Sequence, residues 1–336
     1  MKKIAIIGAG PAGVEAASLL APKFEIHLFE KSANPMDNLL DKAYLFPDFS
    51  AAKELGESLT NKLTHNNIHL HTQREIVSIT HKNNSWEVTD QNKNKEQVDA
   101  ILLTTGYTPF KAELKEELGY KIYNGVITSL DMEQKILQKK IFNTMGENAQ
   151  RVVFLQCVGS RDEKSGNNYC SKICCVTAVK QAIETRKILP HAEIYVFYMD
   201  LRMWGKGFEE MYRSAQEDYD IRFIRGRISE ASSTFNNKVQ IKAEDTLSGR
   251  PLKMTTDLLV LMVGMEASQG TKNLGTQCKI CGKYGFIESQ NPHIGDNKTD
   301  VHGIYVAGTC KKPMSLNDTI NDARSAAWTL MQDLEN

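Results

Sequence analysis

The stretch Ile4-Ala5-Ile6-Ile7-Gly8-Ala9-Gly10-Pro11-Ala12-Gly13 decides the fold of this chain. A short apolar strand, Ile4–Ile7, runs directly into glycines spaced Gly-x-Gly-x-x-Gly, and a helical segment follows. Gly8 permits a tight turn, Gly10 lets the backbone approach a pyrophosphate, and Gly13 lets the helix pack on the strand. The helix N-terminus then favours the anionic pyrophosphate. The stretch therefore predicts a dinucleotide-binding unit.

The residues after this stretch complete the expected context of the motif. Glu25–Glu30 (EIHLFE) reads as a second strand that ends in an acid, and Glu30 can accept a hydrogen bond from a ribose hydroxyl. A lone Gly-x-Gly-x-x-Gly is a weak signal, but strand, glycines, helix, strand and acid in this order are a strong one. We add five residues to the candidate cofactor contacts: Pro11, Ala12, Lys31, Leu39 and Ile76.

Three later segments favour FAD over NAD as the bound dinucleotide. His71–Thr80 is predicted as a strand returning to the adenine side, and Ala100–Gly106 as a buried strand ending in Thr105-Gly106. Gly303–Thr309 reads as another strand, ending at Gly308, and precedes a helix predicted over Leu316–Met331. Taken singly, each segment could equally be an ordinary buried strand.

Together these segments resemble the flavin domain of the two-dinucleotide-domain flavoproteins, which include thioredoxin and glutathione reductases. The resemblance implies an α/β fold with two Rossmann-like, doubly wound domains. It also implies that the last strand and helix place backbone N–H groups near the flavin. The candidate flavin contacts are then Thr105, Gly106, Gly308, Thr309, Thr319 and Ile320. One departure is that Lys31–Leu39 replaces the usual Gly-Gly turn, so this loop must take another path.

A second α/β unit is predicted from Arg151 onward. Strands alternating with helices argue for a second doubly wound domain inserted into the first. We expect a flavin domain of residues 1–110 and 267–336, and an inserted domain of residues 111–266. Polar turns are predicted at His81–Asn84 and Asp90–Glu96. The predicted elements of the second domain are strands at Val152–Gln156, Glu193–Tyr198, Ile221–Ile224, Val239–Ala243 and Leu258–Val263, with a helix at Lys172–Ile188.

Cysteines stand where a second glycine motif would be expected. After Val152–Gln156 the chain reads Cys157-Val158-Gly159-Ser160-Arg161-Asp162, so no pyrophosphate cradle is predicted there. Cys170, Cys174 and Cys175 follow. On a regular helix Cys175 points about 100° away from Cys174, so these thiols converge only if Cys170 lies in a loop or the first turn is distorted. The spacing leaves open an iron–sulfur cluster, a zinc site or inert buried thiols.

Composition sets broader limits. The chain has 336 residues, 41% hydrophobic, with Lys plus Arg at 41 and Asp plus Glu at 41, so no nucleic-acid partner is expected. No apolar run reaches the roughly 18 residues that span a bilayer. Seven cysteines without an export signal favour a reducing compartment, so we expect a cytoplasmic protein.

The cysteine block carries a second resemblance. Its motifs resemble the flavin-carrying A subunit of heterodisulfide reductase and its relatives in quinone-interacting oxidoreductase and bacterial sulfur oxidation. The resemblance implies a [4Fe–4S] cluster held by Cys157, Cys170, Cys174 and Cys175, and partners related to the B and C subunits. A lipoate-binding protein is a further expected partner, and a homodimer within a larger complex is expected. The matching motifs are Gln156–Asp162, Tyr169–Cys175, Val126–Leu130, Phe197–Arg202 and Gly205–Gly207.

Three cysteines remain outside the block. Cys278, Cys281 and Cys310 are too few for the ferredoxin-type clusters of the long archaeal form, so the chain resembles the short form of sulfur oxidisers. An alternative function is a self-contained NAD(P)H-dependent disulfide reductase using Cys278 and Cys281, although a turn holding two inert thiols is favoured. A scaffold that holds a cluster for assembly is a third hypothesis.

Overall fold

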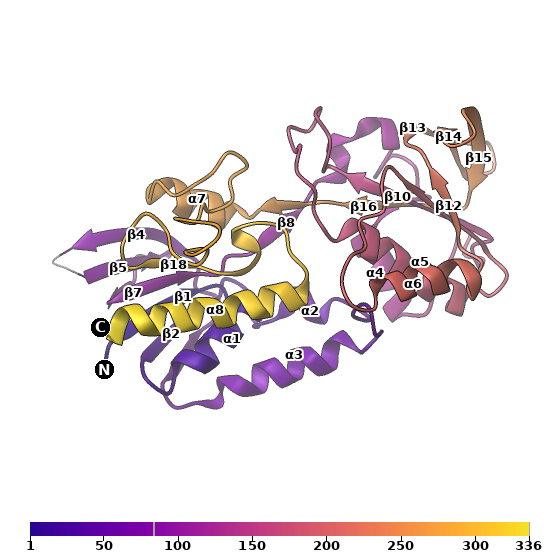
Figure 1. The fold of residues 1–336 in the computed structure, drawn as a ribbon. Helices are drawn as coiled ribbons and strands as arrows, with labels where there is room; N and C mark the ends of the chain where they lie inside the picture. The colour runs from indigo at the N-terminus through magenta and orange to yellow at the C-terminus, as the bar shows by residue number, and fades with distance from the viewer. Residues whose placement is uncertain (83–84, 336) are drawn as a thin grey trace. The chain divides into compact units, whose positions relative to one another are not determined.

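The computed structural model describes residues 1–82 and 85–335 and divides into two compact units (Figure 1). The first unit contains Met1–Leu40, Lys53–Thr108 and Glu266–Asn336. The second contains Asp41–Ala52 and Pro109–Met265. Each unit is built around its own five-stranded parallel sheet.

The sheet of the first unit has the strand order β18-β7-β1-β2-β3. Its strands β1, β7 and β18 are almost entirely apolar because helices or a second sheet cover both faces, whereas the edge strand β3 carries two histidines and is partly exposed. Helix α1 (Pro11–Leu20) lies beside the C-terminal helix α8 (Leu316–Glu335) (Figure 1). The strands are β1 (Lys3–Ile7), β2 (Glu25–Phe29), β3 (Ile68–His71), β7 (Ala100–Leu103) and β18 (Ile304–Val306).

A three-stranded antiparallel sheet packs its apolar side on this core. Trp86 and Val88 of β5 and Ile76 of β4 pack with residues of β1, β7 and β18 in one buried cluster. The remaining elements of the unit are α2 (Asp37–Leu40), α3 (Ala52–Thr60), η1 (Asn61–Thr64), α7 (Gln269–Gln277) and η4 (Gly308–Cys310). The antiparallel strands are β4 (Ile76–Lys82), β5 (Ser85–Asp90) and β6 (Lys95–Val98).

Several predicted strand limits in this unit are wrong. The segment predicted as one strand over His71–Thr80 is two strands, because Gln73 has a φ of 54° and turns the chain between them. The strand predicted over Ala100–Gly106 ends at Leu103, and the one predicted over Gly303–Thr309 gives way to a 3₁₀ turn at Gly308. Of the turn predicted at His81–Asn84, the last two residues lie outside the described part of the chain.

The sheet of the second unit repeats this arrangement, with the order β12-β11-β10-β16-β9. Helices α4 (Ser129–Leu137), α5 (Cys174–Ile188) and α6 (Phe208–Glu217) pack in one buried cluster with β10, β11 and β16. The predicted helix over Lys172–Ile188 therefore begins at Cys174. The strands are β9 (Val126–Thr128), β10 (Arg151–Val158), β11 (Glu193–Tyr198), β12 (Arg222–Arg225) and β16 (Leu258–Val263).

A second antiparallel sheet covers the other face of this unit. It consists of β13 (Ile228–Ser233), β14 (Val239–Asp245) and β15 (Arg250–Thr256), and its apolar residues pack on β10, β11 and β16. The strand predicted over Val239–Ala243 belongs to this sheet and not to the parallel one. Two short 3₁₀ turns, η2 (Ala112–Leu114) and η3 (Glu116–Leu118), precede β9.

The predicted first domain included all of residues 1–110. In the structure, Asp41–Ala52 packs with the second unit instead. Its backbone N–H at Ala43 donates to Oε2 of Glu133 at 3.0 Å, and Lys180 donates to the carbonyl of Tyr44 at 2.9 Å. Phe46 packs on the same apolar cluster as Ala43. Buried polar groups need such partners, so the segment is part of the second unit's core.

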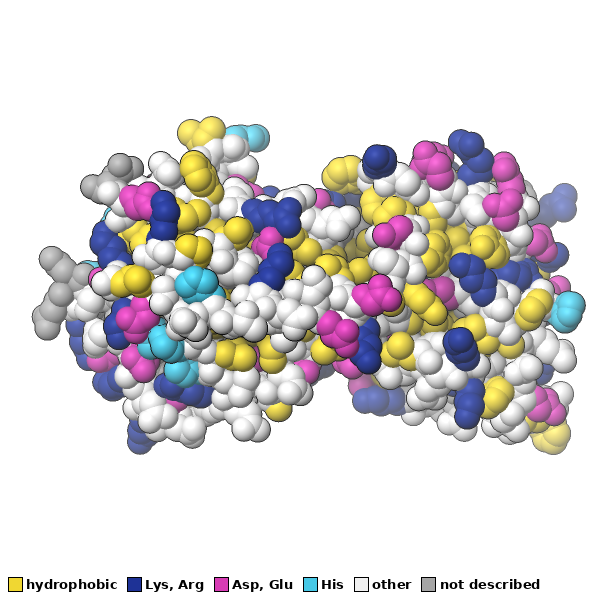
Figure 2. All heavy atoms as spheres, turned by 90° about the horizontal axis from the view of Figure 1, so that it is seen from below, with side chains coloured by type: hydrophobic (Ala, Val, Ile, Leu, Met, Phe, Trp, Pro, Cys, Tyr) yellow, Lys and Arg dark blue, Asp and Glu magenta, His cyan; other side chains and the backbone are white. Residues whose placement is uncertain are grey.

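Strands β8 (Tyr107–Pro109) and β17 (Met265–Ala267) pair with each other where the chain passes between the units. Lys and Arg side chains are interspersed with Asp and Glu over the face seen in Figure 2. Among the described residues, none of the helices combines the length and the apolar character needed to cross a bilayer.

Candidate functional site

The glycine loop after β1 has the geometry of a phosphate cradle. Gly8 has a φ of 111°, and a Cβ there would lie 2.4 Å from the carbonyl oxygen of Thr104. A Cβ on Gly13 would lie 1.9 Å from the carbonyl oxygen of Gly8, so only glycine lets α1 approach the loop. At Gly10, by contrast, a Cβ would meet nothing within 4 Å. That open side is where a ligand can approach the backbone.

Helix α1 directs its N-terminus at this loop. Gly10 is the N-cap residue and Pro11 the first helical residue, and no side chain caps the helix. The first amides of a helix have no acceptor within the helix, so they can donate to an anion. The loop therefore fits a pyrophosphate through backbone groups alone.

Glu30 lies beside the loop and helps to hold it. Its Oε2 accepts from the backbone N–H of Ala9 at 2.8 Å, and its Oε1 accepts from the N–H of Ser32 at 2.9 Å. A carboxylate has about four acceptor sites, so capacity remains for a ribose hydroxyl. The acid thus shapes the cradle as well as offering acceptors to a ligand.

The loop that replaces the Gly-Gly turn folds back on the cradle. Met36 has a φ of 66°, is buried, and donates its backbone N–H to the carbonyl of Ala9 at 3.1 Å. Leu39 is buried behind it. The different path expected for Lys31–Leu39 is therefore a return over the glycine loop.

A groove in the first unit gathers most of the predicted contacts. Four predicted residues, Gly13, Leu39, Gly308 and Ile320, do not line it. Gly13 packs against Gly8, and Gly308 donates its backbone N–H to Oδ2 of Asp322 at 2.7 Å. The predicted residues that line the groove are Gly8, Gly10, Pro11, Ala12, Glu30, Lys31, Ile76, Thr105, Gly106, Thr309 and Thr319.

The groove also has lining residues that sequence reasoning missed. Helix α7 contributes Gly270 and Leu274, and its N-cap residue Ser268 also lines the groove. Ser268 caps α7 by accepting from the N–H of Thr271 and donates its hydroxyl to the carbonyl of Thr105 at 2.9 Å. A serine at the start of a helix is a recognisable capping residue, so Ser268 could have been identified from the sequence as the start of α7. Further lining residues are Phe29, Asn34, Met36, Arg74, Thr104 and Tyr107.

The cysteine block lies at the corresponding place in the second unit. Cys157 stands near the end of β10, as Gly8 follows β1, and left-handed residues turn the chain around it. The φ is 60° at Cys157, 75° at Gly159 and 64° at Lys172. A Cβ on Gly159 would lie 2.0 Å from the ring of Phe110, so this turn requires glycine.

Specific contacts hold the loop between β10 and α5. Asp162 accepts from Nζ of Lys115 at 2.8 Å, and the two side chains are largely buried. Tyr169 donates its hydroxyl to the carbonyl of Met265 at 2.8 Å, and Ser171 accepts from the N–H of Met265 at 2.8 Å. Cys170 lies in this loop and not in α5, as convergence of the thiols requires.

The four thiols gather, and three of them are buried. Cys174 donates a hydrogen bond to Cys157 and interacts electrostatically with Cys170 and Cys175 as well. Backbone N–H groups also point at sulfur: Lys172 donates to Cys170 at 3.3 Å and Arg202 to Cys175 at 3.4 Å. Such donors stabilise thiolate ligands.

The ionisation of the thiols differs within the block. The hydrogen bond from Cys174, with the charge of Arg161, lowers the pKa of Cys157 to about 7. The same bond and burial raise the pKa of Cys174, and burial raises that of Cys175 to about 11. A buried set of thiolates therefore needs compensating positive charge, which a metal centre supplies.

Two buried donors beside the thiols have no hydrogen-bond partner among the described residues: Nε2 of Gln156, whose Oε1 accepts from Cys175, and Nη1 of Arg161, whose charge acts on Cys157. Buried donors are rarely left unpaired, so an acceptor is expected next to them. The sulfurs of an iron–sulfur cluster are such acceptors. The donor set and the thiols together fit that group.

A mononuclear zinc ion fits less well. Tetrahedral zinc with Zn–S bonds of about 2.3 Å brings its sulfurs to about 3.8 Å from one another. Within residues 1–82 and 85–335, one set of three His, Cys, Asp or Glu ligand atoms lies within 4.8 Å of one another, and it is not in this block. In a four-iron cluster each thiolate binds a different iron, so no such crowding is needed.

The other cysteines have different surroundings. Cys278 caps the end of α7, and Cys281 begins a short hairpin in which it pairs with Ile287. Burial raises the pKa of Cys278 to about 11. Cys310 is fully buried, its thiol donates to the carbonyls of Leu103 and Ala307, and burial raises its pKa to about 11.

Comparison with known proteins agrees with this geometry. The family described as pyridine nucleotide-disulphide oxidoreductase matches residues 2–146. The thioredoxin reductase of Lactococcus lactis superposes with a TM-score of 0.70 at 17% identity, covering 99% of this chain and 98% of that one. That of T. acidophilum gives 0.69 at 17% identity, covering both chains fully at 100%. These likenesses confirm the predicted fold.

Two curated relatives are closer in sequence. The A subunit of the H(2)/formate:CoB-CoM heterodisulfide,ferredoxin reductase of Methanococcus maripaludis is 41% identical over 241 residues, 69% of this chain and 36% of that protein. The iron-sulfur A subunit of the CoB–CoM heterodisulfide reductase of Methanocaldococcus jannaschii is 40% identical over 243 residues, 69% of this chain and 37% of that protein. The chain thus spans little more than a third of these relatives.

Fold and sequence likeness together define the class: the fold with two dinucleotide-binding-type domains seen in thioredoxin reductases, whose first part matches the pyridine nucleotide-disulphide oxidoreductase family. Within this class, the sequence relationship is to one kind of subunit. The chain is a homologue of the A subunits of heterodisulfide reductases, as its motifs predict.

Proposed function

We propose that the chain is an electron-transfer subunit that binds FAD in the groove of its first unit and a [4Fe–4S] cluster in its second. It would act in a heterodisulfide-reductase-like complex. One observation carries the proposal: four thiols and two unpartnered donors of the described chain, from Gln156 and Arg161, gather at the end of β10, where the first unit has its glycine loop.

Separate sets of residues would hold the FAD and the cluster. Gly8, Gly10 and the first turn of α1 would hold the flavin's pyrophosphate, with Glu30 beside the ribose. The four cysteines would ligate the cluster: Cys157, Cys170, Cys174 and Cys175. Bound flavin supplies two-electron chemistry and an iron–sulfur cluster supplies one-electron transfer, so a protein with both can link the two kinds of step.

Substrate chemistry is assigned to partner subunits. The relatives named above are A subunits of heterodisulfide reductases. The partners that we propose are relatives of the B and C subunits, together with a lipoate-binding protein. Dissimilatory sulfur oxidation as the setting, and a homodimeric arrangement within the complex, belong to the same proposal.

The alternative of a self-contained disulfide reductase finds less support. Its redox pair would be Cys278 and Cys281, yet burial raises the pKa of Cys278 to about 11, which opposes the thiolate that disulfide exchange requires. The block after β10 also lacks the glycines of a nicotinamide site.

Iron and acid-labile sulfide analysis of anaerobically purified protein, with EPR and flavin quantification, tests the proposal. We expect four irons and one FAD per chain, with iron lost and FAD kept in Cys174→Ser. Cys310→Ser is the matched control, because Cys310 is equally buried but lies outside the block. Stoichiometric FAD without iron, or equal iron in both variants, would contradict the proposal.

A further inference from the structure

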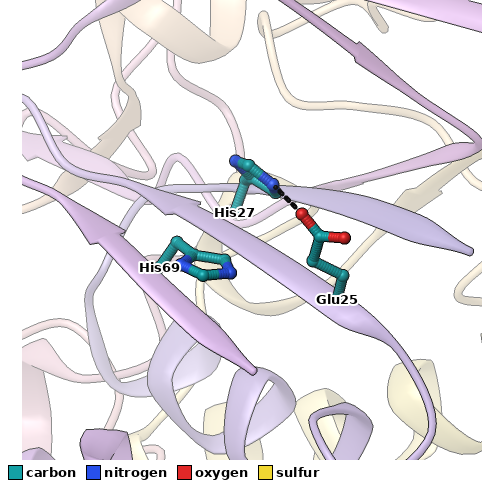
Figure 3. Close-up of side chains that lie close together, drawn as sticks. All are labelled: Glu25, His27 and His69. Atoms are coloured by element: carbon teal, nitrogen blue, oxygen red, sulfur yellow. Dashed lines mark hydrogen bonds and ion pairs between the residues drawn. The ribbon is translucent and has the colours of Figure 1, made fainter. Parts of the chain in front are cut away.

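A group of histidine and glutamate side chains lies at the edge of the first sheet, separate from the cysteine block. Glu25 and His27 lie two residues apart on β2, so they point to the same face of the sheet. His69 on β3 pairs in register with His27, which places its side chain on that face too. Figure 3 shows the three side chains grouped across the two neighbouring strands.

The spacing of these side chains suits a metal ion. One ligand atom from each residue lies within 4.8 Å of the other two, and Nε2 of His27 is 3.0 Å from Oε1 of Glu25. Tetrahedral zinc with bonds of about 2.1 Å requires ligand atoms about 3.4 Å apart. His69 is exposed and Glu25 half-buried, so rotation of these side chains can close the remaining gap.

His27 is the fixed member of the group. It is 7% exposed, and its Nδ1 lies 3.2 Å from Nε2 of His71, in hydrogen-bonding distance. The rings of His27 and His71 also stack. A metal-ligating histidine commonly has its other ring nitrogen held by such a partner, which orients the ring. His71 would therefore be a positioning residue for the site.

Two positively charged side chains, those of Lys3 and Arg74, contact the group. Lys3 lies 3.1 Å from Oε1 of Glu25 with 42% of its side chain exposed, and Arg74 contacts Nδ1 of His71 at 3.3 Å. An exposed ion pair such as that of Lys3 contributes little stability, so a divalent ion can displace it. Arg74 keeps its stronger bond to Asp90 at 2.8 Å if it leaves His71.

We propose that Glu25, His27 and His69 form a binding site for a divalent transition-metal ion, with zinc as the ion that two imidazoles and a carboxylate favour. The ligand set leaves a position for water or an exogenous ligand, and its nitrogen and oxygen donors distinguish it from the thiols of the second unit. Because β3 is the edge strand of the sheet, a bound ion would tie that edge to β2.

Isothermal titration of the purified protein with Zn²⁺ alone tests the site. We expect His69→Ala to remove one zinc site per chain and Glu25→Gln to weaken that site about tenfold or more, since even indirect partners of a metal cost about 10–100-fold. His293→Ala is the matched control, because His293 is an exposed histidine elsewhere in the first unit. Both test variants retain the fold if their far-ultraviolet circular dichroism is unchanged.

Substitution with Co²⁺ gives a second readout that does not depend on stoichiometry. A site of imidazole and carboxylate gives weak visible bands without the thiolate charge-transfer band that cysteine-bound cobalt shows. We expect the weak bands to disappear in His69→Ala and to persist with about tenfold lower affinity in His71→Phe, which keeps the ring stacking. Equal zinc stoichiometry in wild type and His69→Ala, or a purely thiolate cobalt spectrum, overturns the proposal.

Discussion

The thiol of Cys175 donates a hydrogen bond to Oε1 of Gln156 at 3.1 Å, which fixes the side-chain amide of Gln156 from one side. The opposite end of that amide, Nε2, is buried without a partner in the described chain. Gln156 directly precedes Cys157, so its backbone position is set by the same strand end. The amide is thus both a neighbour of one thiol and an available donor beside the block.

Gln156→Leu keeps the side-chain size and removes this donor. An N–H donor stabilises the reduced and more negative form of a cluster, so its loss should lower the reduction potential. A net contribution of about 1 kcal/mol corresponds to about 40 mV for one electron. A redox titration followed by EPR measures the shift. Ser165→Ala is the control, since Ser165 lies in the same loop but donates to Asp162; equal potentials in both variants would argue against the assignment.

Gly10→Ala and Gly13→Ala should separate flavin binding from folding. A Cβ at Gly10 meets no protein atom within 4 Å, and Gly10 has a φ of −78°, so the variant should fold with an unchanged melting temperature. It should bind FAD at least about tenfold more weakly, because the methyl group occupies the pyrophosphate's side of the loop. Fluorescence titration of the apoprotein with FAD measures this.

Gly13→Ala should act on the fold instead. Its Cβ would lie 1.9 Å from the carbonyl oxygen of Gly8, so α1 must move away from the loop. We expect a loss of about 2–4 kcal/mol in the free energy of unfolding of the apoprotein. Similar melting temperatures for the two glycine variants would contradict the role given to each position.

Glu184→Gln should make the protein more stable at alkaline pH. Both carboxyl oxygens of Glu184 are buried without hydrogen-bond partners in the described part of the chain, and burial raises its pKa to about 8. Between the ordinary pKa of 4.5 and about 8 the folded state binds the extra proton, so stability falls as pH rises through this window. Glutamine stays neutral throughout and removes that loss.

The expected gain is about 4 kcal/mol near pH 8 and less than about 1 kcal/mol near pH 5. Chemical denaturation of wild type and variant at the two pH values measures it. Glu217→Gln, on the same unit but exposed at the end of α6, serves as the control. A gain that is the same at both pH values would show that Glu184 is not protonated in the folded state.

Cys310 should resist alkylation in the native protein. Its thiol is fully buried, donates to two backbone carbonyls and has a pKa raised to about 11, so almost no thiolate is present at pH 7. Mass spectrometry after iodoacetamide treatment should find it unmodified until the protein is denatured. Rapid native alkylation at this position would show that the segment after β18 opens readily.

The sequence predicts well those parts of the fold whose signals are local. The order of β1, the glycine loop, α1 and β2 follows from residues that are neighbours in the chain, and the structure matches it closely. The antiparallel sheets were not foreseen as units, because β4–β6 and β13–β15 pack on strands from distant segments. The turn at Gln73 has a left-handed backbone conformation, which could not be predicted because the residue is not glycine.

In the candidate sites, too, features set by neighbouring residues could be predicted and features that depend on the folded backbone could not. Spacing alone could not distinguish a cluster from zinc or inert thiols, because the convergence depends on left-handed backbone at Cys157 and Lys172, neither of which is glycine. The resemblance to heterodisulfide reductase A subunits identified the four cysteines whose thiols lie together in the structure. The groove residues Ser268 and Gly270 were missed because they enter from α7, far along the chain from the glycine loop.

The path of Asp41–Ala52 has a consequence for dissecting the protein. Because this segment leaves the first unit and returns, the chain crosses between the units at four peptide junctions, and neither unit is one continuous piece of polypeptide. A fragment cut at residues 109 and 265 would lose the carbonyl of Tyr44 that accepts from Lys180, and the amide of Ala43 that donates to Glu133. Recombinant expression of the second unit therefore requires the twelve residues Asp41–Ala52 to be supplied as well, either grafted through a linker or added as a peptide.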